Sequence, residues 1–124
     1  MREVGEILTE LRKEKGLNQK ELAALLNLSV GTISNYENDV HAPDLKMLRT
    51  LADFFGVTTD YLLGRTGYRC PPETLKKYIT TDYTVTNFVN IVLSLDPGSR
   101  HALITYANYL NHLRHQAAKS KKPN

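Results

Sequence analysis

The chain has 124 residues, of which 41% are hydrophobic and 23% charged, and its mean hydropathy is −0.37. This length predicts one domain, or one small domain with a helical appendage, and excludes a large two-lobed enzyme. No apolar run approaches the roughly 20 residues that span a bilayer. Glu3, Glu6 and Glu10 interrupt the stretch where a signal peptide would lie. We therefore expect a soluble, cytoplasmic protein with no membrane association.

The net charge of +3 is unevenly distributed along the chain. Residues 1–66 carry eight basic and ten acidic side chains, whereas residues 67–124 carry eight basic and three acidic ones. Phosphate binding needs a positive face, so the acidic excess of the N-terminal half counts against nucleic-acid binding. A local arrangement of cations can still provide that face, because binding depends on where charge lies and not on its sum.

The cysteine and histidine content predicts neither a disulfide nor a metal site. Cys70 is the single cysteine, and its spacing to His41, His101, His112 and His115 matches no zinc pattern. His112 and His115 lie three residues apart but have no third ligand nearby, so we interpret them as a solvated or pH-sensitive face. Cys70 is interpreted as a passive connector residue in preference to a redox-responsive thiol. No metal and no cofactor is predicted.

Two helices are predicted at the start of the chain. Apolar residues at helical spacing predict a first helix over residues 3–15, which Gly16 ends. Asn18 and Glu21 then have the spacing of a capping box and predict the start of a second, short helix.

A tight turn and a third helix follow. Asn27 tolerates the left-handed conformation and Ser29 is a good N-cap, so residues 30–38 are predicted to be helical. Ala23 is small where the second and third helices must approach closely. The residues predicted to form their shared core are Leu22, Leu25, Leu28 and Ile33.

Two further helices complete the N-terminal half. Pro43 and Asp44 open a fourth helix that Gly56 ends, and Thr58 caps a last helical turn. The residues of these two helices expected to face inward or to lie in the last turn are Leu45, Leu48, Leu51, Ala52, Phe55, Tyr61, Leu62 and Leu63.

The C-terminal half is predicted to be a connector followed by two helices. Residues 67–86 are rich in glycine, proline and threonine, with one helical stretch expected around residues 73–79. Residues 88–95 are densely apolar, and Asp96-Pro97 opens a long helix that reaches about His115. The predicted organisation is a DNA-binding domain over 1–66, a connector over 67–86, a helical hairpin over 87–118 and a disordered basic tail over 119–124.

Three stretches of the N-terminal half resemble the lambda-repressor-like, XRE/Cro-type helix-turn-helix family. They are Leu17-Asn18-Gln19-Lys20-Glu21-Leu22-Ala23, Val30-Gly31-Thr32-Ile33-Ser34-Asn35-Tyr36-Glu37-Asn38 with Pro43, and Val57-Thr58-Thr59-Asp60-Tyr61-Leu62-Leu63-Gly64. The resemblance covers about residues 3–65, with five helices in register. It implies an all-α fold and a third helix that enters the major groove of DNA.

The resemblance implies which residues contact DNA. The predicted base contacts are Val30, Gly31, Ser34 and Asn35, and the predicted phosphate contacts are Gln19, Thr32, Asn38, His41 and Lys46. The family commonly has longer polar residues at the base-contacting positions, so part of the specificity is expected to come from DNA shape. Either a close approach of the backbone to DNA or simple tolerance accounts for Gly31.

The resemblance also implies structural roles for three residues. Arg12 and Glu37 look like the family ion pair that joins the first helix to the third, and we favour this role over DNA contact. Tyr36 is interpreted as a packing residue. Lys13, Lys15 and Lys20 are expected to add long-range attraction for DNA.

The last two helices are predicted to hold two copies of the chain together, because their apolar stripes are too extensive to remain exposed. The alternative is that they fold back on the N-terminal domain. The residues assigned to oligomerisation are Phe88, Ile91, Val92, Leu95, Leu103, Tyr106, Leu110 and Leu113, with Tyr109 beside them.

The sequence predicts a transcriptional regulator that binds double-stranded DNA, acting as a repressor at a palindromic operator in the form of a homodimer or higher oligomer. The alternative hypothesis is a protein-interaction or antitoxin-like module whose partner binds the C-terminal helices. An effector or a further protein partner is left open. No catalysis is predicted, because the chain has no Gly-rich phosphate loop and no nucleophile paired with a base.

Overall fold

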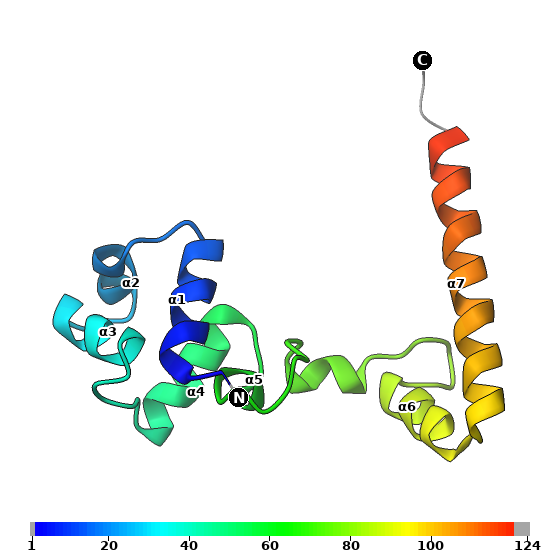
Figure 1. The fold of residues 1–124 in the computed structure, drawn as a ribbon, viewed down its shortest axis with the longest axis horizontal. Helices are drawn as coiled ribbons and strands as arrows, with labels where there is room; N and C mark the ends of the chain where they lie inside the picture. Colours follow the sequence, from blue (N-terminus) through cyan, green and yellow to red (C-terminus); the bar gives the residue numbers. More distant parts are fainter. Residues whose placement is uncertain (1, 121–124) are drawn as a thin grey trace. The chain divides into compact units, whose positions relative to one another are not determined.

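The computed structural model describes residues 2–120, and this part of the chain consists of seven α-helices and one short 3-10 helix, without a β-strand (Figure 1). The predicted all-α fold class is confirmed. The helices divide between two compact units, Met1–Thr74 and Leu75–Asn124. The division falls inside the stretch that the sequence marks as a connector.

The first unit contains the five helices expected from the sequence. They are α1 (Val4–Glu14), α2 (Gln19–Leu25), α3 (Val30–Glu37), α4 (Leu45–Phe55) and α5 (Thr59–Leu62). Side-chain caps set four of their starts: the side chains of Asn18, Ser29, Asp44 and Thr58 each accept a hydrogen bond from the backbone N–H three residues later. Gly16 follows α1 with a φ of 70° and Gly56 follows α4 with a φ of 64°, so each takes the left-handed conformation that glycine adopts without strain.

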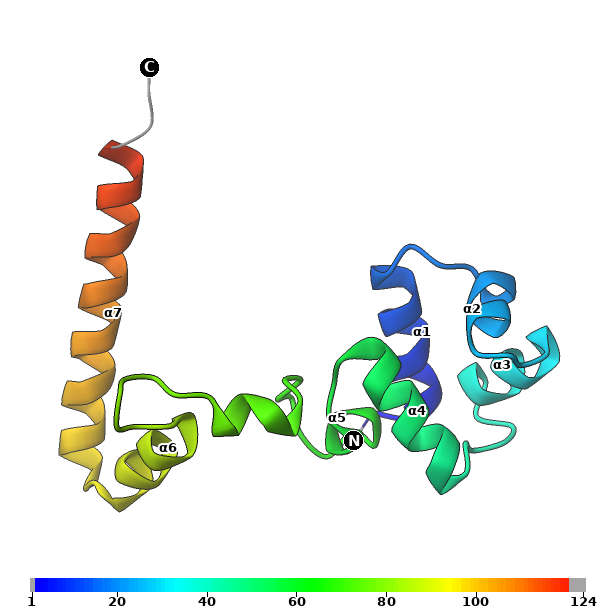
Figure 2. The same cartoon turned by 180° about the vertical axis from the view of Figure 1, so that it is seen from behind.

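The core of the first unit consists of two apolar clusters. Figure 1 and Figure 2 show the five helices of this unit from opposite sides. The larger cluster joins α1 to the end of α4 and to α5 through Ile7, Leu8, Leu11, Leu51, Ala52, Val57, Tyr61 and Leu62. The smaller cluster joins α2 to α3 through Leu22, Ala23 and Ile33. Tyr36 packs against the larger cluster, in agreement with its predicted packing role.

Two leucines predicted to be in the core are exposed. Leu25 is 62% exposed, because the buried side of α2 is formed by Leu22 and Ala23, and Leu25 lies beyond its edge. Leu45 is 78% exposed, because it is the first residue of α4 and the buried side of that helix centres on Leu51. Both predictions were wrong, and both residues lie at helix ends, where few neighbours surround a side chain.

Gly5 lies on the buried side of α1, where this helix meets the end of α3. The backbone N–H of Gly5 donates to Oδ1 of Asp39 over 2.9 Å. A Cβ at this position would collide with the carbonyl oxygen of Glu37 and would come within 2.7 Å of Oδ2 of Asp39. The close approach of α1 to α3 therefore requires a glycine at position 5.

A buried ion pair joins α1 to α3. Nε and Nη2 of Arg12 donate to the two carboxylate oxygens of Glu37 over 2.7 and 2.9 Å, and the two side chains are only 11% and 5% exposed. Thr9 and Gln19 also donate to this carboxylate, over 3.1 and 3.2 Å. Arg12 uses its remaining Nη1 to donate to the carbonyl oxygen of Leu17. The pair therefore lies in a network in which both charged groups are hydrogen-bonded.

The network sets the protonation of Glu37. Burial alone would raise the pKa of this carboxyl, but the hydrogen bonds from Arg12, Gln19 and Thr9, together with the charge of Arg12, outweigh burial and hold the pKa below its ordinary value of 4.5. The hydrogen bond to Glu37 and the charge of that carboxylate raise the pKa of Arg12 above its ordinary value, against the effect of burial. Both groups are therefore charged at neutral pH.

The second unit contains α6 (Val85–Ser94) and α7 (Pro97–Ser120), preceded by the 3-10 helix Pro72–Lys76. The helical stretch expected around residues 73–79 is thus a 3-10 turn that ends at Lys76. Helix α6 begins at Val85, three residues before the predicted apolar run, because Thr84 and Asn87 form a capping box. Helix α7 continues beyond His115, so Lys119 and Ser120 are helical and not part of the predicted tail, while residues 121–124 lie outside the described residues.

The connection between α6 and α7 consists of two residues, Leu95 and Asp96. Arg100, in the first turn of α7, donates through Nε to the carbonyl oxygen of Val92 over 3.0 Å and through Nη2 to that of Leu93 over 2.6 Å. Because α6 has 10 residues and α7 has 24, α6 can accompany α7 only near this turn. The two helices do not pack along their lengths, so the predicted hairpin is limited to its turn.

Replacing Gly5 by alanine should destabilise the protein by about 1–3 kcal/mol, because the new methyl group overlaps backbone and carboxylate atoms that α3 holds in place. Urea denaturation of the whole chain measures the change. The matched control is Gly31→Ala, where a Cβ meets nothing closer than 3.9 Å, and helix propensity predicts a gain of about 0.5–1 kcal/mol. Equal effects of the two substitutions would contradict the close approach at Gly5.

Replacing Glu37 by glutamine should cost about 3 kcal/mol at pH 7, because the buried guanidinium of Arg12 then lacks an opposite charge. A depressed pKa in the folded state adds stability above the pKa of the unfolded state, and this contribution is lost as the pH falls through the folded pKa. The difference between wild type and variant should therefore shrink in acid below about pH 4. Urea denaturation as a function of pH measures both effects.

The control for this prediction is Glu14→Gln, which removes an exposed ion pair with Arg69 and should cost less than about 1 kcal/mol. The assigned role of Glu37 fails if the two variants lose equal stability at pH 7, or if the cost of Glu37→Gln is the same at every pH.

Candidate nucleic-acid interface

Helices α2 and α3 are joined by the four residues 26–29. Asn27 has a φ of 56°, the left-handed conformation expected for it, and the carbonyl oxygen of Ala23 accepts from the N–H of Leu28 over 2.8 Å. Ala23 is 2% exposed and lies in the cluster with Leu22 and Ile33. This combination of a small residue, a left-handed turn residue and a shared apolar cluster fixes α3 rigidly against α2.

Helix α3 presents two different faces. Ile33 is buried, and Tyr36 and Glu37 turn toward the same interior, where they meet the larger cluster and Arg12. The helical spacing places Gly31, Ser34 and Asn35 on the other side, together with Asn38, whereas Val30, the first residue of α3, lies nearer the side of Ile33 and Glu37. Of these, Val30 and Gly31 are exposed, and Ser34 and Asn35 are half-buried. The outer face of α3 is therefore accessible in the described chain.

The polar groups on this face are only partly used within the protein. The amide of Asn35 has no hydrogen-bond partner among the described residues, while its backbone carbonyl accepts from the N–H groups of Val40 and His41. Nδ2 of Asn38 donates to the carbonyl oxygen of Ser34 over 2.9 Å and to its Oγ over 3.2 Å. Asn35 thus has a complete amide, with donor and acceptor, available for a ligand.

Two of the predicted phosphate contacts have side chains engaged inside the protein. Gln19 is half-buried, and its Nε2 donates to the carboxylate of Glu37. The hydroxyl of Thr32 lies 2.8 Å from that of Ser29, the N-cap of α3. Two groups of Gln19, the first residue of α2, are still available to a ligand: its side-chain oxygen and its backbone N–H. The three other predicted contacts, Asn38, His41 and Lys46, are exposed.

The acidic residues of α1 are partly neutralised by two arginines. Arg2 pairs with Glu6 and Glu10, and Arg69 pairs with Glu14 over 2.5 Å. These contacts reduce the local effect of the acidic excess in the N-terminal half. Among the expected long-range cations, Lys15 lies over the ring of Phe54, with Nζ 5.1 Å from the ring centroid.

Sequence reasoning missed three residues that position α3. Thr9 joins the Glu37 network, and Gly5 and Asp39 join the start of α1 to the segment after α3. Gly5 carried a recognisable signal, because a glycine inside an amphipathic helix costs about 1 kcal/mol and so indicates a close approach. No local pattern marks Thr9 or Asp39.

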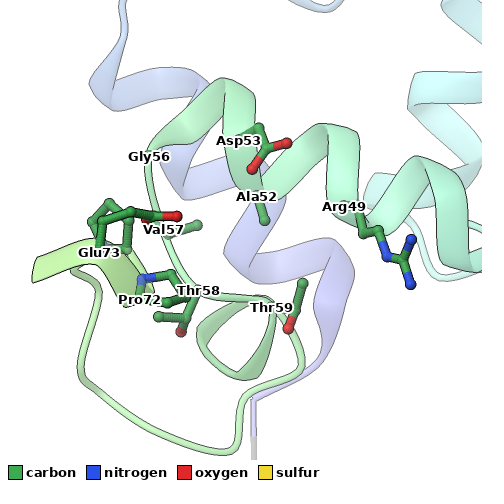
Figure 3. A pocket seen from close by; sticks show the side chains of 10 residues that line it. Arg49, Ala52, Asp53, Gly56, Val57, Thr58, Thr59, Pro72 and Glu73 are labelled. Atoms are coloured by element: carbon green, nitrogen blue, oxygen red, sulfur yellow. The ribbon is translucent and has the colours of Figure 1, made fainter. Parts of the chain in front are cut away.

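A separate open hollow of about 430 Å³ lies in the first unit, between the second half of α4, residues 56–59 and residues 71–73. Figure 3 shows its polar side chains, which include Arg49, Asp53, Thr59 and Glu73. None of the predicted site residues lines it. The hollow is therefore distinct from the outer face of α3.

Within residues 2–120, no cluster of three or more histidine, cysteine, aspartate or glutamate side chains has an arrangement that could hold a metal ion. Over the same residues, no helix has the length and apolar character needed to cross a membrane. His112 and His115 are both exposed on α7, and Cys70 is exposed in the connector.

The residues predicted to mediate oligomerisation fall into two groups. Three of them are partly buried near the turn between α6 and α7, and these are Val92, Leu95 and Leu103. The other five are exposed, and these are Phe88, Ile91, Tyr106, Leu110 and Leu113. Exposed apolar side chains therefore occur on both helices, and Leu93, close to the turn, is 65% exposed.

Residues 8–62 match the family model described as helix-turn-helix. The chain is similar to the HTH-type transcriptional regulator ImmR of Bacillus subtilis (strain 168), with 44% identity over 62 residues, which are 50% of this chain and 49% of that protein. It is also similar to the HTH-type transcriptional regulator AnsR of the same organism, with 45% identity over 58 residues, or 47% of this chain and 50% of that protein. A crystal structure of a transcriptional regulator from Listeria innocua aligns with 90% of this chain and 94% of its own, at 22% identity and a TM-score of 0.49.

The chain spans about half the length of the two curated relatives, and each match covers no more than half of this chain. The matched residues 8–62 include the cluster that joins α2 to α3, the turn at Asn27 and the outer face of α3. Residues 8–62 of the N-terminal unit therefore match the helix-turn-helix family, in agreement with the predicted resemblance.

Proposed function

We propose that the chain is a sequence-specific regulator of transcription that inserts α3 into the major groove of double-stranded DNA. The observation that carries this proposal is the division of α3 into a buried side and an accessible polar side, with the amide of Asn35 free among the described residues. An asparagine amide can pair with the donor and acceptor that adenine presents in the major groove. Val30 can contact a thymine methyl group, and Ser34 can bond to either a base or a phosphate.

Phosphate contacts position α3 in this proposal. Asn38, His41 and Lys46 are exposed and bind the backbone through their side chains. The free carboxamide oxygen of Gln19 is an acceptor, so it can reach a phosphate only through a bridging water. The direct contact of Gln19 is its backbone N–H at the start of α2, where the helix dipole favours an anion. Thr32 contributes through its hydroxyl, which is hydrogen-bonded to the hydroxyl of Ser29.

The proposed regulator is a repressor that binds a palindromic operator as a dimer. One copy offers few base-contacting side chains, and Gly31 offers none. Two copies related by a two-fold axis read half-sites about 34 Å apart and so double the number of contacts. The oligomerisation residues of α6 and α7 supply the surface that holds the copies together. Repression follows where such a dimer occupies promoter DNA.

Replacing Asn35 by alanine should weaken binding to the operator by about 1–3 kcal/mol and remove discrimination at one base pair, while leaving binding to random DNA unchanged. Selection of bound DNA from a random pool identifies the operator, and gel-shift titration on operator and random duplexes measures the losses. A loss of the same size on both duplexes would remove Asn35 from its assigned role.

The matched variant is Gln19→Ala, which keeps the backbone N–H and removes only the water-mediated contact of the side-chain oxygen; it should lower the affinity for operator and random DNA by a similar, small factor, because phosphate contacts carry no sequence information. Gln19 also donates to Glu37, so urea denaturation is measured alongside to separate altered folding from altered binding. Loss on the operator alone would assign Gln19 to sequence reading instead.

The affinity for DNA should fall with salt, because cationic side chains that bind phosphates release counterions. Lys46 from each of two copies gives a slope of log K against log salt of about −2 or steeper. A slope near zero would contradict DNA binding and favour the alternative of a protein-interaction module. Lys46→Gln should reduce the slope of a dimer by about 2, and Lys119→Gln, on α7, should leave it unchanged.

A further inference from the structure

Helix α7 carries an apolar repeat that the described chain leaves exposed beyond Leu103. Its apolar residues follow one another at alternating spacings of three and four, which is the heptad pattern of a coiled-coil seam. The seam consists of Leu103, Tyr106, Leu110, Leu113 and Ala117. We propose that α7 pairs along this seam with α7 of a second copy of the chain. The inference rests on the proposed function, for which it names the partner and the surface.

The seam is open beyond its first residue. Leu103 is partly buried near the turn to α6, whereas Tyr106, Leu110 and Leu113 are 60%, 46% and 43% exposed. Helix α6 is less than half as long as α7 and does not pack along it. The second unit by itself therefore leaves the seam uncovered over at least ten residues.

The charges of α7 fit a second copy of the same helix. This helix has no acidic residue, so two copies would repel each other if their cations lay beside the seam. The helical spacing instead places His101, His112, His115 and Lys119 on the opposite face. Arg114 and Arg100 lie at flanking positions of the heptad, and Arg100 is bonded to the carbonyl oxygens of Val92 and Leu93; the other flanking positions have no charge.

The residues that flank the seam widen it. They are Ala102, Ala107, Tyr109 and Gln116, of which Tyr109 is 55% exposed. An acidic partner would be matched by cations beside the apolar stripe, and α7 has its cations on the other side. A helix of the same repeat, with uncharged flanks, is the occupant that this surface fits. Ile104 is the large apolar side chain of α7 that the seam leaves out.

The pairing is tested by the mass of the whole chain in solution, measured by light scattering during size exclusion. Wild type should have at least twice the 14.0 kDa mass of one chain. Leu110→Asp should have the mass of one chain at the same concentration. Asn108→Asp introduces the same charge on the opposite face of the same turn and should keep the wild-type mass.

Leu110→Ala keeps a strong helix former in place and separates loss of pairing from loss of the helix. This variant should raise the dissociation constant of the pair by at least about tenfold, with the helical circular dichroism signal retained. The proposal is overturned if wild type is monomeric, if Leu110→Asp keeps the wild-type mass, or if Asn108→Asp also becomes monomeric.

A DNA titration distinguishes failure of the pairing from failure of the proposed function. Leu110→Asp leaves α3 intact and should bind a single half-site as tightly as wild type, but should lose the added affinity for the complete palindrome. A wild type that pairs through α7 and binds no DNA would support the pairing and refute the regulator. A wild type that binds the palindrome but is monomeric both free and on DNA would support the regulator and refute the pairing.

Discussion

The buried carboxylate of Glu37 is the constraint on which the arrangement of the first three helices depends. It accepts hydrogen bonds from Thr9 and Arg12 of α1 and from Gln19 of α2, while its own residue ends α3. The apolar clusters supply most of the stabilising free energy, but burial of apolar area is non-directional and tolerates shifted packings. A buried charge does not, because an unpaired one costs several kcal/mol. The ion pair therefore selects one orientation of α3 among those that the apolar contacts would permit.

The outer face of α3 follows from this orientation. With Ile33 and Glu37 on one side of the helical wheel and held inward, the residues on the opposite side must face outward. The side chains of this face reach only a short distance, because Gly31 has none and that of Ser34 is small. The hydroxyl of Ser34 also accepts a hydrogen bond from Asn38. A ligand must therefore approach the backbone of α3 closely to use it, and the open space around Gly31 permits that approach. In the proposed function, DNA shape therefore adds to the specificity that Asn35 supplies.

The residue patterns predicted what is local, whereas contacts between distant residues were either implied by the family resemblance, as for Arg12 and Glu37, or missed. The caps at Asn18 and Ser29 and the positive φ of Asn27 involve residues within four positions of one another, so their patterns are visible in the chain. Leu25 was assigned to the core by its type, but only the packing of α1, α3 and α4 decides which side of α2 is covered. The donation from Gln19 to Glu37 joins residues 18 positions apart, and no local pattern indicates it.

In the second unit, too, the helices could be predicted from the sequence but their packing could not. Its helices are predictable from apolar spacing and from the Thr84 capping box, yet the sequence does not show that α6 stops covering α7 after the first turns. Arg100 fixes this outcome, because its hydrogen bonds to two carbonyl oxygens at the end of α6 hold the turn and leave α7 to extend alone. A helix of 24 residues is about 36 Å long. Because contacts within the chain bury little of the apolar stripe of α7, they gain little free energy from it. Association with another molecule can still gain the free energy of burying this stripe.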